Sequence, residues 1–239
     1  MKQAGVMMQC GVCGGTDFQT VAVLWDKLIE EWQLSRSEVE YVNRQQGRVC
    51  LGCGANLRSI ALANALRGFL KTTKYLSDPQ LPSEWQELSI LEINEAGTLT
   101  PYLKKFPKYS YGAYPEVDMH SLPYGDQNFD VVIHSDTLEH IPNPVHALTE
   151  CCRVLRQDGV LCFTVPVIVG RLSRSREGLS RSYHGNPDTP LEDFAVHTEF
   201  GADAWTHVFE AGFSEVTMHA VEYPAAVAFL ARRDCSKSS

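Results

Sequence analysis

The sequence contains no stretch long and apolar enough to cross a membrane. A spanning helix needs about 20 predominantly apolar residues. The longest charge-free apolar run, residues 159–170, is about half that length and contains Pro166. No apolar core precedes Cys10, so the N-terminus does not resemble a secretion signal. These absences lead us to expect a cytoplasmic protein with no membrane partner.

Positive charge is also scarce. The 239 residues include 21 Lys and Arg against 29 Asp and Glu, which gives a net charge of −8. Proteins that bind nucleic acid through its phosphates usually carry an excess of basic residues. The charge balance therefore argues against nucleic acid as the main partner. The length allows one large domain, or one large domain with a small appendage, and the sequence gives no indication of the oligomeric state.

Four of the eight cysteines form two Cys-x-x-Cys pairs. Cys10 with Cys13, and Cys50 with Cys53, stand in glycine-rich turns that can direct two thiolates at one metal ion. Together the pairs supply four sulfur ligands, so the sequence predicts a closed, structural zinc site. Two disulfides or a redox pair are the alternative, which a cytoplasmic location opposes. Iron is the competing metal.

The segment between the cysteine pairs is predicted to be helical. One helix is indicated by apolar residues at helical spacing, namely Trp25, Leu28, Ile29 and Trp32. Ser35 and Glu38 form a capping-box pattern that begins a second helix, which Gly47 could end. A third helix follows the second pair. We therefore divide the chain into a four-cysteine module with a helical insert, residues 1–75, and a larger domain, residues 76–239.

From residue 89 onward, strand and helix patterns alternate. Strands are predicted at 89–93, 109–114, 129–133, 160–167, 214–221 and 225–231. Helices are predicted to begin at Thr100-Pro101 and Asn143-Pro144, and a further helix at 201–211. Such alternation is typical of a doubly wound α/β sheet with helices on both faces.

Five segments of this half have a specific order and spacing. They are Ile90-Leu-Glu-Ile93, Asp118-Met-His-Ser-Leu-Pro123, Asn128-Phe-Asp-Val-Val132, Leu138-Glu-His-Ile-Pro-Asn-Pro144 and Arg153-Val-Leu-Arg-Gln-Asp-Gly159. With them, residues 89 to about 232 resemble class I S-adenosylmethionine-dependent methyltransferases of types 11 and 23. The resemblance implies a Rossmann-like sheet, S-adenosylmethionine as the cofactor and methyl transfer as the activity.

The resemblance also implies a set of residues around the cofactor. They are Glu92, Asn94, Ala96, Gly97, Tyr114, Asp118, Met119, His134 and Ser135. Glu92 is implied to help hold the cofactor's ammonium group. Tyr114, or the nearby Glu116, takes the place of the residue that binds the ribose. Asp118 is implied to accept a hydrogen bond from the adenine amino group, and the backbone N–H of Met119 to meet the adenine ring.

The turn after the first strand departs from the family pattern. Asn94, Ala96 and Thr98 occupy positions where the family usually has glycine. Asn tolerates a left-handed conformation better than most residues, and Ala adds only one methyl group, so the turn is still expected to admit the cofactor. The alternative is a degenerate, methyltransferase-like scaffold protein that has lost cofactor binding and acts through its cysteine module.

Three residues that follow the predicted strand at 129–133 are candidates for catalysis. If a helix begins here, Asp136, Glu139 and His140 share one face. In ubiquinone-type O-methyltransferases a similar cluster is implicated in holding a divalent cation, which would acidify a hydroxyl group. The alternative, which we favour, is that Glu139-His140 orders the following proline-rich loop. His184, farther along, is a further candidate base.

Positive charge is concentrated in the loop after the predicted strand at 160–167. The predicted substrate-binding residues there are Arg171, Arg174, Arg176 and Tyr183. Arg suits phosphate and carboxylate groups, so the acceptor is expected to be anionic, unless the loop is simply solvated. No Asn/Asp-Pro-Pro-Tyr motif of base N-methyltransferases follows the predicted strand at 129–133. This favours O-methylation of a small molecule or sugar-like acceptor over a third possibility, a zinc-dependent RNA modifier.

Overall fold

The computed structural model describes residues 8–80, 82–183 and 192–233. The candidate base His184 lies outside these ranges. At the centre is a six-stranded sheet of order β10-β11-β6-β5-β3-β4. Its strands are β3 (Ser89–Ile93), β4 (Lys108–Gly112), β5 (Phe129–Ser135), β6 (Leu155–Thr164), β10 (Glu215–Val221) and β11 (Ala226–Arg232). The first four run parallel, and β11 pairs with both β6 and β10 in antiparallel register.

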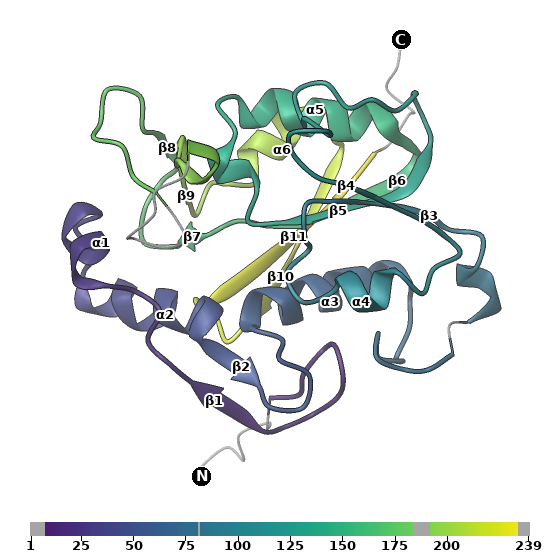
Figure 1. Ribbon diagram of the computed structural model, residues 1–239, viewed down its shortest axis with the longest axis horizontal. Coiled ribbons are helices and arrows are strands. Elements are labelled where there is room, and N and C mark those ends of the chain that lie inside the picture. The colour runs from purple at the N-terminus through teal and green to yellow at the C-terminus, as the bar shows by residue number, and fades with distance from the viewer. Residues whose placement is uncertain (1–7, 81, 184–191, 234–239) are drawn as a thin grey trace.

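Helices cover both faces of this sheet (Figure 1). Helices α5 (Pro144–Val154) and α6 (Thr206–Glu210) lie on one face, with α3 (Leu57–Phe69) and α4 (Thr100–Leu103) on the other. Because side chains alternate along a strand, Ile90 joins the cluster on the α3 face and Leu91 the cluster on the α5 face. The predicted doubly wound sheet is confirmed.

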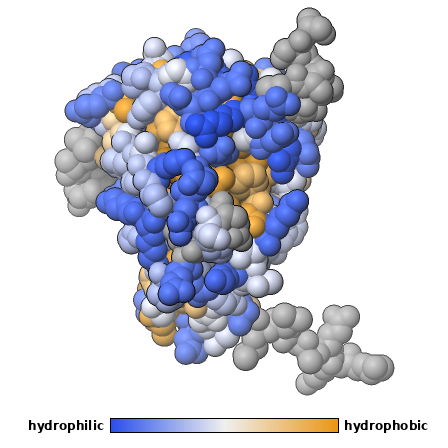
Figure 2. Space-filling view, turned by 90° about the vertical axis from the view of Figure 1, so that its right-hand side faces the viewer, coloured by the Kyte–Doolittle hydropathy of each residue, from blue (hydrophilic) through white to orange (hydrophobic). Residues whose placement is uncertain are grey.

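Apolar side chains are largely enclosed in these two clusters. Figure 2 shows the side of the molecule that lies at the right of Figure 1. Hydrophilic residues cover most of it, and hydrophobic residues come to the surface mainly in a hollow. Within the described ranges, no helix has the length and apolar content of a membrane span.

The N-terminal segment forms a small hairpin that carries two helices. Strand β1 (Phe18–Thr20) pairs antiparallel with β2 (Arg48–Cys50), and helices α1 (Asp26–Glu31) and α2 (Arg36–Gly47) lie between them in the chain. The predicted capping box at Ser35 is present, since its hydroxyl accepts from the N–H of Glu38 and the Glu38 carboxylate accepts from the N–H of Ser35.

Packing does not divide the chain at residue 75. Helix α3, which the sequence analysis assigned to the cysteine module, packs against β6, β10 and β11. One apolar cluster contains Cys10 and Trp32 from the N-terminal segment together with Ile90 and Ile133 from the sheet. The cysteine segment and the sheet therefore share a hydrophobic core.

The region after β6 differs from its predicted form. Strands β7 (Val167–Ile168), β8 (Arg174–Ser175) and β9 (Thr198–Gly201) make a three-stranded sheet, and η3 (Glu192–Phe194) precedes β9. The expected helix over 201–211 is shortened to α6. A Cβ on Gly201 would lie 2.2 Å from the carbonyl oxygen of Arg171, so β9 requires glycine where the loop crosses it.

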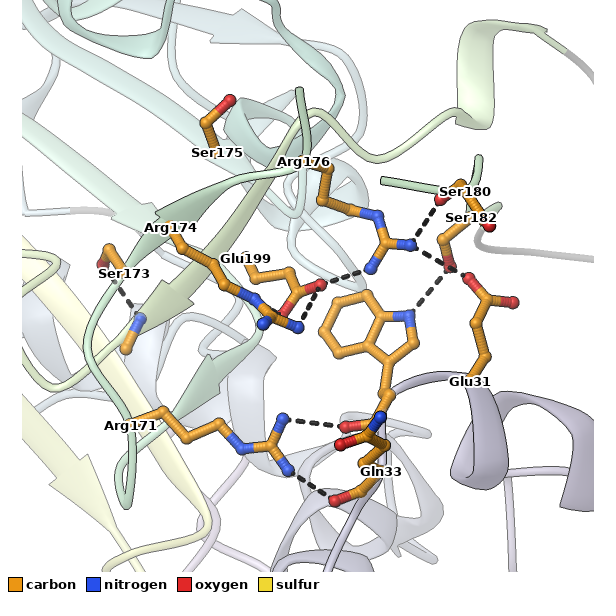
Figure 3. Close-up of polar contacts among 12 residues, drawn as sticks. Glu31, Gln33, Arg171, Ser173, Arg174, Ser175, Arg176, Ser180, Ser182 and Glu199 are labelled. Atoms are coloured by element: carbon orange, nitrogen blue, oxygen red, sulfur yellow. Dashed lines mark hydrogen bonds and ion pairs between the residues drawn. The ribbon is translucent and has the colours of Figure 1, made fainter. Parts of the chain in front are cut away.

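Arginines of this loop fasten the N-terminal segment to the sheet (Figure 3). The Arg171 guanidinium donates to both carboxylate oxygens of Glu38 at 2.7 and 2.9 Å. It also donates to the carbonyl oxygens of Trp32 at 2.8 Å and Gln33 at 2.9 Å. The hydrogen bonds from Arg171 lower the pKa of Glu38 to about 2.

Two further arginines share the buried Glu199. Arg174 donates to its carboxylate at 2.8 and 3.1 Å. Arg176, itself buried, contacts Glu199, pairs with Glu31 at 3.2 Å and donates to the carbonyl oxygen of Ser180 at 2.6 Å (Figure 3). Together with Arg171 and Glu38, these residues form what we call the arginine clamp.

The clamp gives Arg171, Arg174 and Arg176 partners within the chain, which argues against the expectation that they bind an anionic acceptor. Their guanidinium groups are directed at acidic side chains and carbonyl oxygens of the chain itself. A sequence pattern of like charges cannot reveal such partners, because Glu31, Glu38 and Glu199 lie far away in the sequence.

Replacing Arg171 with Ala is expected to destabilise the protein by about 1.5–3 kcal/mol. The substitution removes charge-assisted hydrogen bonds to a mostly buried carboxylate. The matched control is Arg36→Ala, since Arg36 and Glu40 form a fully solvated pair at 3.7 Å; its effect should stay within about 0.5 kcal/mol. Urea unfolding measures both, and equal effects would contradict the clamp.

Candidate active site and metal centre

A cavity of about 670 Å³ opens at the carboxyl ends of β3, β4 and β5. Here the strand order reverses, because β4 lies on one side of β3 and β5 on the other. Doubly wound sheets bind ligands at such a point. Five of the predicted cofactor residues line the cavity: Asn94, Tyr114, Asp118, Met119 and Ser135. The topology thus brings together residues that are up to 41 positions apart in the sequence.

Asn94 shapes two walls of this cavity. It adopts the left-handed conformation, with φ of 54°, which Asn tolerates better than most side chains. Its backbone N–H donates to Gly112 at 2.8 Å, and its side-chain oxygen accepts from the N–H of Tyr114 at 3.1 Å. Asn94 therefore ties the turn after β3 to the segment after β4.

Glu92 lies behind the cavity and holds the turn after β3 in place. Its carboxylate is fully buried. It accepts from the N–H of Ala96 at 2.7 Å, from the hydroxyl of Thr100 at 2.5 Å and from the hydroxyl of Tyr109 at 2.5 Å. Burial and the adjoining Glu92 both raise the pKa of Tyr109. The Glu92 oxygens thus hold the turn and the start of α4, and Glu92 does not line the cavity; its contact with an ammonium group stays a prediction.

The rest of the turn also faces the protein. Ala96 is buried and, like Gly97, does not line the cavity. Gly97 has φ of 58°, and a Cβ there would lie 2.4 Å from the hydroxyl oxygen of Ser59. The same hydroxyl accepts from the N–H of Thr98 at 3.1 Å. The glycine is thus required by the close approach of α3.

His134 is likewise buried, contrary to expectation. Consecutive strand residues point to opposite faces of a sheet, so Ser135 reaches the cavity while His134 packs on Phe163, with 5.3 Å between the ring centroids. Burial lowers the pKa of His134 to about 4. The imidazole is therefore a neutral part of the core and has no contact with the cavity.

The predicted helical face of Asp136, Glu139 and His140 does not form. Asp136 has φ of 51°, and only the short 3₁₀ turn η2 (Leu138–His140) follows. The N–H of Asp136 donates to Thr164 of β6 at 3.0 Å, which holds the backbone beside the sheet. The Asp136 carboxylate pairs instead with the buried Arg58 at 2.7 Å.

Asp136 and His140 nevertheless line the cavity. Nδ1 of His140 lies 3.1 Å from the carbonyl oxygen of Ala195, and Nε2 lies 3.6 Å from the Glu139 carboxylate. In the described part of the chain, these residues do not form a group with metal-binding geometry. The divalent-cation interpretation has no support in this arrangement.

Several lining residues were missed by sequence reasoning. Tyr111, Thr137, Phe194 and His197 also line the cavity. Tyr111 could have been identified from strand alternation, since it lies opposite Glu92 in the register of β3 and β4. Phe194 had no local signal, because it arrives from η3, beyond the arginine loop. Tyr183 bridges to Ala195 and lines neither this cavity nor the one described next.

A second cavity, of about 280 Å³, adjoins the first. Both are lined by Asp136, His140 and Phe194. Most of its other walls come from the N-terminal segment: Val23, Leu24, Trp25, Leu28, Trp32, Leu34, Val42, Gln45 and Gln46. The remaining residues are Arg58, Glu139, Pro166 and Ile168.

The four cysteines of the N-terminal segment converge on one point. Their sulfur atoms all lie within 4.8 Å of one another, with Cys10 to Cys53 at 3.6 Å and Cys13 to Cys50 at 3.7 Å. A tetrahedral zinc ion with Zn–S bonds of about 2.3 Å has sulfur–sulfur edges of about 3.8 Å. A disulfide needs about 2.05 Å, and all four cysteines are free. The arrangement fits a structural zinc ion.

Cys53→Ser is expected to abolish stoichiometric zinc binding and to cost at least about 3 kcal/mol, which lowers the Tm by about 6–12 °C. Elemental analysis and thermal unfolding test this. The control is Cys152→Ser on α5, outside the cluster, which should keep its zinc. A Cys53→Ser protein with one zinc per chain would rule out the site.

Part of the chain is similar to known proteins. Residues 98–163, from α4 to the end of β6, match a family model described as a methyltransferase domain. A probable S-adenosylmethionine-dependent methyltransferase of Mycobacterium tuberculosis is 31% identical over 112 residues, which cover 44% of this chain and 36% of the relative. Another from Mycolicibacterium smegmatis is 33% identical over 107 residues, which cover 42% of this chain and 36% of that protein.

The match thus spans about a third of the length of these curated relatives. Among solved structures, an S-adenosylmethionine-dependent methyltransferase of Thermotoga maritima is 16% identical, with a TM-score of 0.42 over 74% of this chain and 90% of that one. The doubly wound fold is identified by the strand order of the six-stranded sheet itself. Within the doubly wound sheet, residues 98–163 match a methyltransferase domain, and the four cysteines ahead of them form a cluster suited to a zinc ion.

Proposed function

We propose that the protein transfers a methyl group from S-adenosylmethionine to a small-molecule acceptor. The observation that carries the proposal is the cavity at the carboxyl ends of β3, β4 and β5. It lies at the reversal of strand order, and its volume is in the range of about 300–1,000 Å³ typical of small-molecule sites. Its walls include polar groups at the positions where the family resemblance implies cofactor contacts.

Asp118 and its neighbours would hold the nucleoside. The Asp118 side chain is about half exposed, and one carboxylate oxygen accepts from the N–H of His120 at 2.8 Å. This bond fixes the carboxylate at the cavity wall, where it could accept from an adenine amino group. Met119 offers a buried apolar contact beside it, and Tyr114 lies where the resemblance implies the ribose.

The bound cofactor would supply a methyl group on a positively charged sulfur, already activated for displacement. The protein's part is then to align the acceptor and to exclude water. We assign a hydroxyl group to the acceptor, which makes the reaction an O-methylation. Asp136 and His140, which lie between the two cavities, are the groups we propose to take the hydroxyl proton.

Two alternatives are less well supported. A scaffold protein without cofactor is disfavoured because Asn94 accommodates the altered turn and the cavity remains open. An RNA modifier is disfavoured because Arg171, Arg174 and Arg176 serve the clamp. The same contacts weaken the case for a strongly anionic or nucleotide-linked sugar acceptor.

Calorimetric titration with S-adenosylhomocysteine tests the proposal. We expect micromolar binding by the wild-type protein and at least tenfold weaker binding by Asp118→Ala, because a charge-assisted hydrogen bond contributes about 1.5–3 kcal/mol. Asp126→Ala is the control, since Asp126 is exposed and does not line the cavity. Folded, zinc-loaded protein that shows no binding would refute the proposed function.

A further inference from the structure

We infer that the second cavity is the acceptor site, and that it takes a small, uncharged, ring-containing molecule with one hydroxyl group. The inference deepens the proposed function and rests on it. In place of the arginine loop, which the sequence left open as either an acceptor site or a solvated loop, it assigns a site built largely by the N-terminal segment.

The walls of the second cavity are apolar and held in place. Leu28, Trp32 and Ile168 are each less than a tenth exposed. The indole N–H of Trp32 donates to the hydroxyl of Ser182 at 2.8 Å, and the Arg176 guanidinium lies 5.6 Å from the centre of the Trp32 ring. Walls of this kind suit a flat apolar ring. The volume of about 280 Å³ lies near the lower end of the range for small-molecule sites.

The cavity also contains a buried group that lacks a partner in the described part of the chain. Gln45 is 2% exposed, and its side-chain N–H donates to the carbonyl oxygen of Val167 at 2.8 Å. That bond fixes the amide, and its oxygen Oε1 has no hydrogen-bond partner. Leaving a buried acceptor unsatisfied is unfavourable. A ligand O–H would satisfy it.

The charges in the cavity disfavour an anionic ligand, and its largely apolar walls make burial of any unpaired charge costly. Arg58 is 5% exposed, and its charge is paired with Asp136 at 2.7 Å. The other acidic side chain in the wall is the buried Glu139. A carboxylate or phosphate would therefore meet two acidic residues beside one arginine whose charge is already paired. Burying it there would be unfavourable.

The position of the cavity fits an acceptor. Because Asp136, His140 and Phe194 line both cavities, a molecule in the second cavity lies directly beside the one proposed for the cofactor. Its reacting group would face the candidate proton acceptors. The N-terminal segment thus supplies the specificity of the reaction, while the sheet supplies the cofactor site.

Binding of 2-naphthol, a two-ring alcohol, tests the inference. We expect saturable binding of one molecule per chain, followed by calorimetry and by quenching of tryptophan fluorescence, in the presence and absence of S-adenosylhomocysteine. Val42→Trp, which places a large ring in the cavity wall, should weaken 2-naphthol binding at least tenfold and leave S-adenosylhomocysteine binding unchanged. The matched control is Val21→Trp, since Val21 is half exposed on the same segment and outside the cavity.

A second variant tests the polar contact. Gln45→Leu should weaken binding of 2-naphthol several-fold but leave binding of naphthalene, which has no hydroxyl, equal or stronger. Wild-type protein that binds S-adenosylhomocysteine but not 2-naphthol, or a Val42→Trp variant that binds 2-naphthol normally, would overturn the inference. Binding of 2-naphthol without any binding of S-adenosylhomocysteine would support the second site and overturn the proposed function instead.

Discussion

The arrangement of the second cavity depends on the ion pairs that join the N-terminal segment to the sheet. Arg171 reaches Glu38 on α2, and Arg176 reaches Glu31 on α1, while Glu199 on β9 receives both Arg174 and Arg176. These pairs are mostly buried, so losing one partner would leave an uncompensated charge. They fix α1 and α2 across the carboxyl edge of the sheet, where the two helices close the second cavity.

The four-cysteine cluster anchors the other end of the same segment. Cys10 and Cys13 precede the two helices, and Cys50 and Cys53 follow them, so one metal ion would close the loop that carries both. The turn that contains Gly11 packs closely against α3, because a Cβ on Gly11 would lie 2.1 Å from the side chain of Asn64. A structural metal ion at one end of the N-terminal segment and the arginine pairs at the other would then hold the wall that this segment gives to the proposed acceptor site.

Much of the fold could be predicted from the sequence because its signals are local. The capping box at Ser35, the Asn143 cap of α5 and the strand at residues 89–93 each depend on neighbouring residues. The roles of Glu92, His134 and the arginines depended on partners far away in the chain. Glu92 was identified as important, but its oxygens bind the turn and Tyr109. The second cavity could not be predicted, because its walls come from segments far apart in the sequence, joined by the clamp and by contacts such as that of Gln45 with Val167.

We propose that two adjoining cavities, which meet at Asp136 and His140, hold cofactor and acceptor. A crystal structure of the protein with S-adenosylhomocysteine would test this arrangement. The adenine is expected beside Asp118 and Met119, with the sulfur atom facing the wall that both cavities share. A nucleoside bound elsewhere, or a sulfur directed away from Asp136 and His140, would contradict it.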